Sequence, residues 1–100
     1  MPYTKGFVDD DTLTEKFDKH VILQSEFPGV TTKAEYFNLA DEFCGGARDA
    51  NTQEHTRSYD GAILRYNKNT NEFGIVGNDG FIRAYYKPSA GERYFIRNCK

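Results

Sequence analysis

The segment EKFDKH, residues 15–20, brings together residue types that move protons and hold anions. On a helix, Lys16, Lys19 and His20 would share one side, because residues three and four apart are neighbours there. An imidazole titrates near neutral pH and can exchange a proton with a ribose hydroxyl, while ammonium groups attract phosphate. This combination suits a metal-independent ribonuclease, in which the lysines would stabilise the charge that develops at phosphorus.

A structural role for His20 is the alternative. His20 follows Phe17 by three residues, so it borders an apolar stripe of Leu13, Phe17 and Val21 rather than facing bulk water. Histidines in such places more often complete internal hydrogen bonds than catalyse a reaction. The one other histidine, His55, does not lie at metal-ligand spacing from His20, and the carboxylates are scattered, so we expect neither a metal nor a cofactor.

A second set of candidates lies in the C-terminal half, where basic and aromatic residues alternate. In FIRAYYK, residues 81–87, strand alternation predicts one face with Phe81, Arg83, Tyr85 and Lys87, and another with Ile82, Ala84 and Tyr86. In AILRY, residues 62–66, Ile63 and Arg65 would oppose Ala62, Leu64 and Tyr66. Guanidinium groups interleaved with tyrosine rings suit phosphate and unpaired bases. An ordinary half-solvated sheet is the alternative.

The length and the charge distribution of the chain limit its number of domains and the kind of partner that it can bind. One hundred residues predict a single domain with one modest core. Residues 1–54 hold five basic and eleven acidic residues, a net charge of −6, whereas residues 55–100 hold eight basic and four acidic ones, +4. This asymmetry predicts an anionic partner for the second half. Cys44 and Cys99 predict neither a disulfide framework nor a metal site. No apolar run is long enough to span a bilayer, and the polar N-terminus lacks the features of a signal peptide.

Local signals predict helices first and strands afterwards. Residues 1–10 read as a flexible lead-in and 11–100 as one domain. The TLTE box predicts a helix from near Thr12 to the FPG at 27–29, and TKAE predicts a second one, with Tyr36, Leu39, Ala40 and Phe43 on one face and a stop at Gly45-Gly46. Turns at Asp60-Gly61, 67–71, 77–80 and KPSAGE predict an antiparallel meander that ends in RYFIR. The expected fold is α+β, with N-terminal helices on one face of a twisted four- to five-stranded antiparallel sheet.

The order of these parts resembles a known toxin family. The segments are KHVILQSEF, then TTKAEYFNLADEF, then RSYDGAILRYNKNTNEFGIVGNDGFIRAYYKP, then RYF. Together they resemble the C-terminal tRNase toxin domains of contact-dependent growth inhibition and other polymorphic toxin systems, and more distantly the tRNase domain of colicin D. The resemblance runs from about residue 12 to 97, and the RYNKNTNEFG…DGFIRAYYKP portion is its most specific part.

The resemblance implies a barnase/EndoU/colicin/RelE-like RNase fold and a metal-independent endoribonuclease that cuts tRNA in the anticodon region. By position, His20 falls on the general acid/base of the family. The other residues expected to take part in catalysis are Lys19, Arg65, Arg83, Tyr86 and Lys87, and those expected to bind substrate are Lys16, Thr70 and Tyr85. The expected product carries a 2′,3′-cyclic phosphate.

The resemblance also implies a setting. Such a domain is exported as the C-terminal part of a larger surface-displayed toxin, acts in the cytoplasm of the target bacterium, and is blocked by a cognate immunity protein, here expected to be acidic. Two positions depart from the family pattern: Ala84 stands where Thr or Ser is frequent, and Val21 replaces the glycine that follows KH. The alternatives are an RNase for rRNA or mRNA, and a non-enzymatic RNA- or protein-binding module that uses the Arg/Tyr sheet face.

Overall fold

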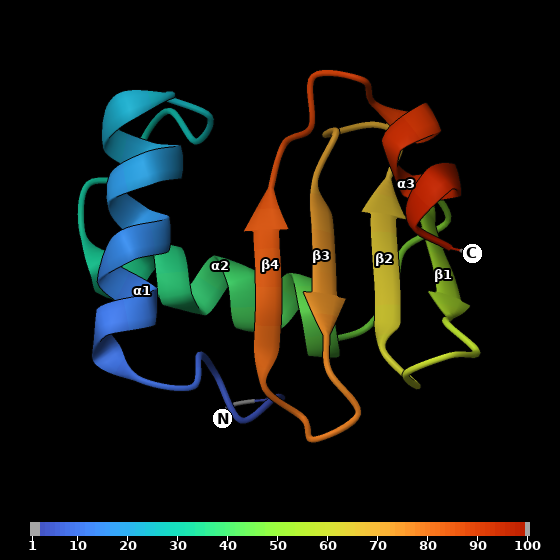
Figure 1. Cartoon of the computed structure of the whole chain (residues 1–100). Helices are drawn as coiled ribbons and strands as arrows, with labels where there is room; N and C mark the ends of the chain where they lie inside the picture. Colours follow the sequence, from blue (N-terminus) through green and yellow to red (C-terminus); the bar gives the residue numbers. More distant parts are fainter. Residues whose placement is uncertain (1–2, 100) are drawn as a thin grey trace.

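The protein has an α+β fold in which helices cover a four-stranded sheet (Figure 1). A computed structural model describes residues 3–99. Its elements are α1 (Asp10–Phe17), the π-helix η1 (Asp18–Leu23), α2 (Lys33–Gly45), β1 (Thr52–Thr56), β2 (Ile63–Asn67), β3 (Phe73–Val76), β4 (Ile82–Tyr86) and α3 (Glu92–Asn98). The strands pair antiparallel in the order β1-β2-β3-β4. The predicted fold class is confirmed, and the predicted antiparallel meander is confirmed as far as β4.

The first helix begins earlier than the TLTE box predicts and ends in a different way. The side chain of Asp9 caps α1 by accepting the Thr12 N–H at 2.7 Å, and two further acidic residues in the first turn favour the same end. After Phe17 the chain widens into η1, where the N–H of Gln24 donates to the carbonyl of Lys19 at 3.0 Å, a bond across five residues. The helix is therefore closed by this wide turn, before the FPG segment is reached.

The second helix forms as its capping box predicts. Thr32 and Glu35 exchange side-chain and backbone hydrogen bonds at its start, and the helix ends at Gly45. Its buried face was wrongly predicted at one position, because Leu39 is 39% exposed. Cys44 instead reaches the sheet at Gly74, where an added Cβ would lie 2.5 Å from the Cys44 Sγ, so a glycine allows this close approach.

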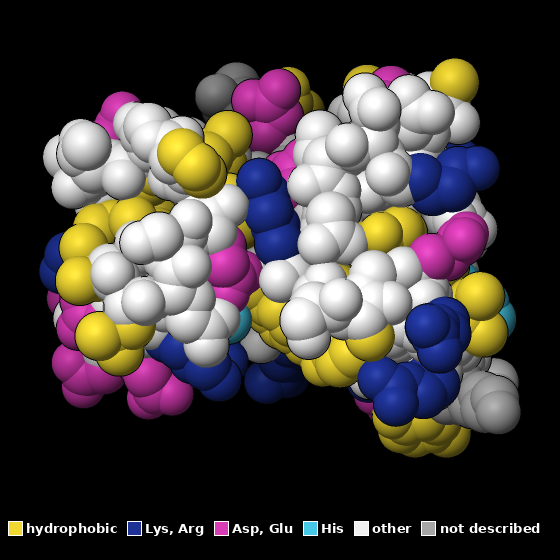
Figure 2. Space-filling model, turned by 90° about the horizontal axis from the view of Figure 1, so that it is seen from above, with side chains coloured by type: hydrophobic (Ala, Val, Ile, Leu, Met, Phe, Trp, Pro, Cys, Tyr) yellow, Lys and Arg dark blue, Asp and Glu magenta, His cyan; other side chains and the backbone are white. Residues whose placement is uncertain are grey.

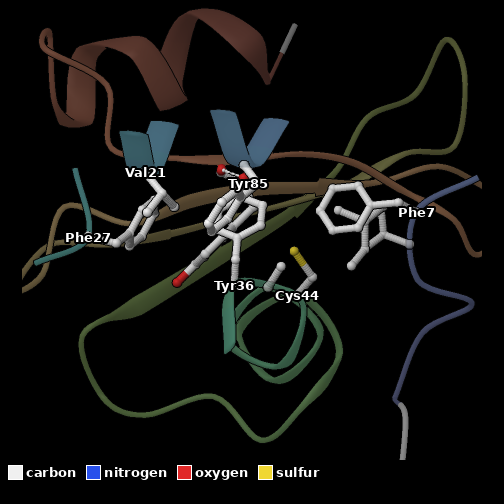
Figure 3. Close-up of a cluster of buried hydrophobic side chains, with 10 residues drawn as sticks. Phe7, Val21, Phe27, Tyr36, Cys44 and Tyr85 are labelled. Carbon is white, nitrogen blue, oxygen red and sulfur yellow. Dashed lines mark hydrogen bonds between the residues drawn. The ribbon is translucent and has the colours of Figure 1, made fainter. Parts of the chain in front are cut away.

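The main core lies between the first two helices and one face of the sheet (Figure 3). Tyr36 of α2 and Tyr85 of β4 are both 0% exposed, and the Tyr36 hydroxyl donates to the backbone carbonyl of Tyr85 at 2.6 Å. Phe27 stacks on Tyr85 with ring centres 4.9 Å apart. Val21 of η1 completes this side of the cluster, so the π-helical turn and the segment that follows it at Phe27 are both packed against the sheet.

The described part of the predicted lead-in is bound to the rest of the fold. The backbone N–H groups of Tyr3 and Thr4 donate to the carboxylate of Asp41 at 2.7 and 2.8 Å. The backbone at Lys5 and Gly6 exchanges hydrogen bonds with the β3–β4 turn and the start of β4. Residues 3–7 are therefore held beside the start of β4, and Phe7 packs into the main core.

The C-terminal segment RYFIR forms a helix, and the prediction of a strand there was wrong. Phe95 of α3 is buried against Tyr66 and Phe73, on the face of the sheet opposite α2. Five alternating residues suit a strand and a one-sided helix equally well. The helix starts at Gly91, whose positive φ of 61° turns the chain across the sheet face.

A β-bulge in β4 overturns part of the predicted alternation. Val76 pairs with Ile82 and Ile75 pairs with Ala84, so Arg83 is the extra residue. Ile82 therefore shares the α2 face with Tyr85, although simple alternation separates them. Ala84 lies on the other face. In β2, by contrast, the predicted grouping of Ala62, Leu64 and Tyr66 is confirmed.

Candidate active site

An open cleft of about 690 Å³ lies between η1, the end of β4 and the start of α3. Viewed from above, basic side chains stand in a groove with acidic and histidine side chains at its wall (Figure 2). Its lining residues are Lys16, Lys19, His20, Gln24, Glu26, Ala84, Tyr86, Lys87, Pro88, Ser89 and Tyr94. The cleft thus joins the EKFDKH segment to the end of the RAYYKP segment.

At the cleft wall, His20 and Glu26 form a buried pair. Nδ1 of His20 lies 2.8 Å from Oε2 of Glu26, and the two side chains are only 5% and 10% exposed. The other carboxylate oxygen accepts the backbone N–H of Lys87 at 2.6 Å. Because Glu26 is held at both oxygens, it fixes the imidazole relative to the end of β4. A carboxylate on Nδ1 favours a proton on that nitrogen.

The second ring nitrogen of His20 is left without an intramolecular partner among residues 3–99. The hydrogen bonds of this part of the chain include one at Nδ1 and none at Nε2. Every fully buried side-chain nitrogen or oxygen in the same part has a partner. Nε2 therefore reaches the cleft surface, although the residue as a whole is only 4% exposed. It is free to accept or donate a proton there.

Tyr86 supports the imidazole from one side. The two rings are stacked, with centres 4.9 Å apart and planes inclined by 7°. The Tyr86 hydroxyl is hydrogen-bonded to the hydroxyl of Tyr94 from α3. Burial, and then the bond to Tyr94, raise the pKa of Tyr86 well above its usual range, so this hydroxyl stays neutral near pH 7. Because one hydroxyl of the pair donates to the other, one O–H remains to donate to an anion in the cleft.

Three lysines supply the positive charge of the cleft. Lys16 and Lys19 come from α1 and η1, and Lys87 follows β4. Within residues 3–99, none of the three forms an ion pair with a carboxylate. Lys87 Nζ lies 5.1 Å from the centre of the Phe27 ring, which holds the ammonium group at the rim. These charges are available to an anionic ligand.

The far wall of the cleft is anchored by the β2–β3 turn. Asn71, in the left-handed conformation at φ 63°, donates through Nδ2 to the carbonyl of Pro88 at 2.9 Å. Its side-chain oxygen accepts the Tyr66 hydroxyl at 2.7 Å. The segment at Pro88 and Ser89 is thereby fixed to the sheet, and this defines the width of the cleft.

Of the predicted site residues, His20, Lys16, Lys19, Tyr86 and Lys87 lie together in the cleft, whereas Arg65 and Arg83 do not. Arg65 binds Glu54 at 2.7 Å and the carbonyls of Phe43 and Gly46, so it caps α2 on the opposite face. Arg83 is turned outward by the bulge. It forms an ion pair with Asp79 in the β3–β4 turn.

Thr70 and Tyr85 also lie outside the cleft. The Thr70 hydroxyl donates to Glu72 at 2.6 Å within the β2–β3 turn. Tyr85 is fully buried in the main core, where its hydroxyl is bonded to Glu72. The Arg/Tyr sheet face expected for a binding module is therefore not present as one surface, since its arginines are paired and one of its tyrosines is buried.

Two residues that complete the site, Glu26 and Tyr94, were not predicted from the sequence. Glu26 stands in the SEF segment before Pro28, and Tyr94 stands in a segment assigned to a strand. A signal for Glu26 was present, because it is the only carboxylate between Asp18 and Glu35. Ala84, which was noted because Thr or Ser is frequent there in the toxin domains that the sequence resembles, lines the cleft.

Comparisons with known proteins give no identification. No family model matches the chain, and no curated protein matches it.

Within residues 3–99, no group of three or more His, Cys, Asp or Glu side chains could hold a metal ion. No helix in this part is both long and apolar enough to cross a membrane. Cys44 lies in the core, where burial raises the pKa of its thiol to about 12, so it does not supply a thiolate near His20.

Proposed function

We propose that this protein is a metal-independent endoribonuclease in which His20 is the general base and acid. The observation that carries the proposal is the His20–Glu26 pair, which is buried but leaves Nε2 open to a lysine-lined cleft. With the proton held on Nδ1 by a carboxylate, the Nε2 lone pair is directed to substrate, as in other catalytic histidine–carboxylate pairs.

The proposed reaction is a transesterification within the RNA chain. Nε2 of His20 takes the proton of a ribose 2′-hydroxyl as O2′ attacks the adjacent phosphorus. The P–O5′ bond breaks, and the imidazolium returns the proton to the departing O5′. The products are a 2′,3′-cyclic phosphate and a 5′-hydroxyl. No step needs a metal or an external reactant.

The other cleft residues stabilise the charge that develops in this reaction. Lys16, Lys19 and Lys87 line the cleft and have no carboxylate partner in the part of the chain that the structure describes, so they can bind the non-bridging phosphate oxygens. Tyr86 orients the imidazole by stacking, and its neutral hydroxyl can donate to the phosphate. The proposal gives no step to Arg65 or Arg83, because both are paired elsewhere.

For the substrate we propose tRNA, cut in the anticodon region. This choice rests on the sequence resemblance to tRNase toxin domains, and an anticodon loop offers the unpaired bases that proteins recognise in RNA. On the same basis we propose that the domain is the C-terminal part of an exported bacterial toxin, which acts in the cytoplasm of the target bacterium. An acidic immunity protein would bind the lysine-lined cleft as its inhibitor.

The test is incubation of the purified protein with total bacterial tRNA in EDTA, followed by a denaturing gel. We expect discrete fragments from the wild type and none from His20→Ala, a loss of about 10²- to 10⁴-fold in rate. His20→Gln is the second variant, because a Gln side chain can still donate to Glu26. Equal thermal unfolding temperatures would show that these proteins are folded.

Three outcomes test the role of His20, the choice of substrate and the proposal of an enzyme in turn. Fragments that persist in both His20 variants would remove His20 from the reaction. Cleavage of rRNA or mRNA fragments but not of tRNA would keep the enzyme and change its substrate. Ala84→Thr is included because position 84 lines the cleft. If neither the wild type nor this variant cuts any RNA, the proposal of an enzyme is wrong.

A further inference from the structure

Outside the cleft, the exposed side of α3 carries a second basic surface. A shallow hollow of about 420 Å³ lies there, lined by Ala90, Arg93, Ile96 and Arg97. Both arginines are exposed, and within residues 3–99 neither forms an ion pair with a carboxylate. Their spacing of four residues places them on one side of α3, about one helical turn apart.

The hollow continues from the cleft. Ser89 lines the cleft and the next residue, Ala90, lines the hollow. On α3, Tyr94 lines the cleft while Arg93 and Arg97 line the hollow. The Arg97 guanidinium lies 5.9 Å from the centre of the Tyr94 ring, so the two surfaces meet at that side chain. A polymer that leaves the cleft past Tyr94 reaches the arginines next.

We propose that α3 is a second phosphate-binding surface, which holds the RNA strand next to the scissile phosphate. This inference rests on the proposed function of the cleft. Guanidinium groups match phosphate oxygens in pairs, and Ile96, which is 54% exposed, gives an apolar contact for a base. The lysines of the cleft and the arginines of α3, none of which has a carboxylate partner within residues 3–99, place positive charge on both sides of Tyr94, which complements a strand with a charge at every nucleotide.

The experiment compares two charge reversals of equal size. Arg93→Glu/Arg97→Glu alters the hollow, and Lys5→Glu/Arg48→Glu is the control. Lys5 and Arg48 are exposed and line neither the cleft nor the hollow. Both double variants change the net charge by the same amount, so a difference between them reports position and not total charge.

The first readout is the binding of a fluorescent 2′-O-methyl RNA oligonucleotide, measured by anisotropy at several salt concentrations. This ligand has no free 2′-hydroxyl and cannot be cut by the proposed route. We expect the α3 variant to bind about tenfold more weakly. Its salt dependence should fall by about 1.4 in the slope of log K against log salt, the value for two phosphate contacts to a single strand. The control should match the wild type.

The second readout is cleavage of tRNA and of a dinucleotide. The α3 variant should lose about tenfold in kcat/KM for tRNA through KM, with dinucleotide cleavage within about twofold of the wild type. Unchanged oligonucleotide binding, or an equal loss in the control, would overturn the inference. The ligand of the α3 arginines would then be an acidic protein and not RNA. If the wild type cuts neither substrate, the proposed enzyme fails, and the anisotropy still decides what α3 binds.

Discussion

Glu26 and Glu72 are two carboxylates that bind aromatic side chains, His20 and Tyr85. The two pairs differ in whether the aromatic partner keeps a polar atom that a ligand can reach. Glu26 binds His20, whose second nitrogen reaches the cleft. Glu72 binds the hydroxyl of Tyr85, a residue that is 0% exposed in the main core, and also accepts the hydroxyl of Thr70. Both oxygens of Glu72 are bonded within the protein, although Glu72 itself is half-exposed, whereas the Glu26 pair presents a free nitrogen to the cleft.

This difference shows which feature of a polar cluster indicates chemistry. Tyr85 and Tyr86 are neighbours in the chain, yet the former is enclosed against α2 and the latter stacks on His20 in the cleft. Burial, and then the negative charge of Glu72, raise the pKa of Tyr85 far above its usual range, which makes it a permanent hydrogen-bond donor in the core. A group whose hydrogen bonds are all internal serves stability. A group with one open bond can act on a ligand.

The largest effect that tests this comparison is on activity. In Glu26→Gln, one amide group must face both Nδ1 of His20 and the backbone N–H of Lys87. If its oxygen accepts from Lys87, its NH₂ group faces Nδ1 and moves the imidazole proton to Nε2. We expect RNA cleavage to fall by about 10²- to 10⁴-fold, as measured by initial rates on tRNA.

The matched control is Glu72→Gln, which changes the same functional group in the closed pair. Cleavage should stay within about threefold of the wild type, while the free energy of unfolding falls by about 1–2 kcal/mol, because the Tyr85 hydroxyl then donates to a neutral amide oxygen and no longer to a charged carboxylate. The comparison breaks if both variants lose activity in proportion to their loss of stability.

A second, smaller effect separates the two neighbouring tyrosines. Tyr85→Phe removes the donor to Glu72 from a buried site, so it should lower the free energy of unfolding by about 1.5–3 kcal/mol with little change in cleavage. Tyr86→Phe keeps the ring that stacks on His20 but removes the cleft hydroxyl, so we expect about tenfold slower cleavage and at most about 1 kcal/mol lost. Urea unfolding and initial rates on both variants make the test. Equal losses of stability would contradict it.

The parts of this protein that depend on local sequence were predictable. The capping box of α2 forms as expected because both of its partners lie within one turn. Lys16, Lys19 and His20 were grouped correctly for the same reason, since helical spacing alone places them on one side. The turns between the strands also follow from short polar segments rich in asparagine or glycine, with Gly61, Asn71 and Gly80 at positive φ, and they define the meander.

The parts that depend on contacts distant in sequence were not predictable. The bulge at Arg83 arises from the way β4 pairs with β3, and it turns Arg83 away from the cleft. The choice of helix for α3 depends on the sheet face that receives Phe95. The pairing of Glu26 with His20 needs the wide turn of η1, which no short motif announces. Helical spacing therefore predicted that Lys16 and Lys19 lie near His20, but it did not predict the contact with Glu26.

The smallest effect concerns a third carboxylate, Asp41, which resembles Glu72 in having only internal partners. It accepts hydrogen bonds from the N–H groups of Tyr3 and Thr4 and from the Thr4 hydroxyl. Burial alone would raise its pKa, but these hydrogen bonds outweigh burial and lower the pKa of Asp41 below the ordinary 3.8. Its contribution to stability is therefore complete above about pH 5 and is lost as the pH falls through the folded-state value.

Asp41→Asn tests this sign directly. The variant should lose about 1 kcal/mol of unfolding free energy at pH 7, because an amide offers one acceptor oxygen where the carboxylate offers two. Between pH 5 and pH 2 its stability should fall less steeply than that of the wild type, as measured by urea unfolding at each pH. Cleavage at pH 7 should not change, since Asp41 holds the N-terminal segment and does not line the cleft. A parallel acid dependence in the two proteins would mean that the Asp41 contacts add no pH-linked stability, and the division between closed and open carboxylates would then rest on Glu26 and Glu72 alone.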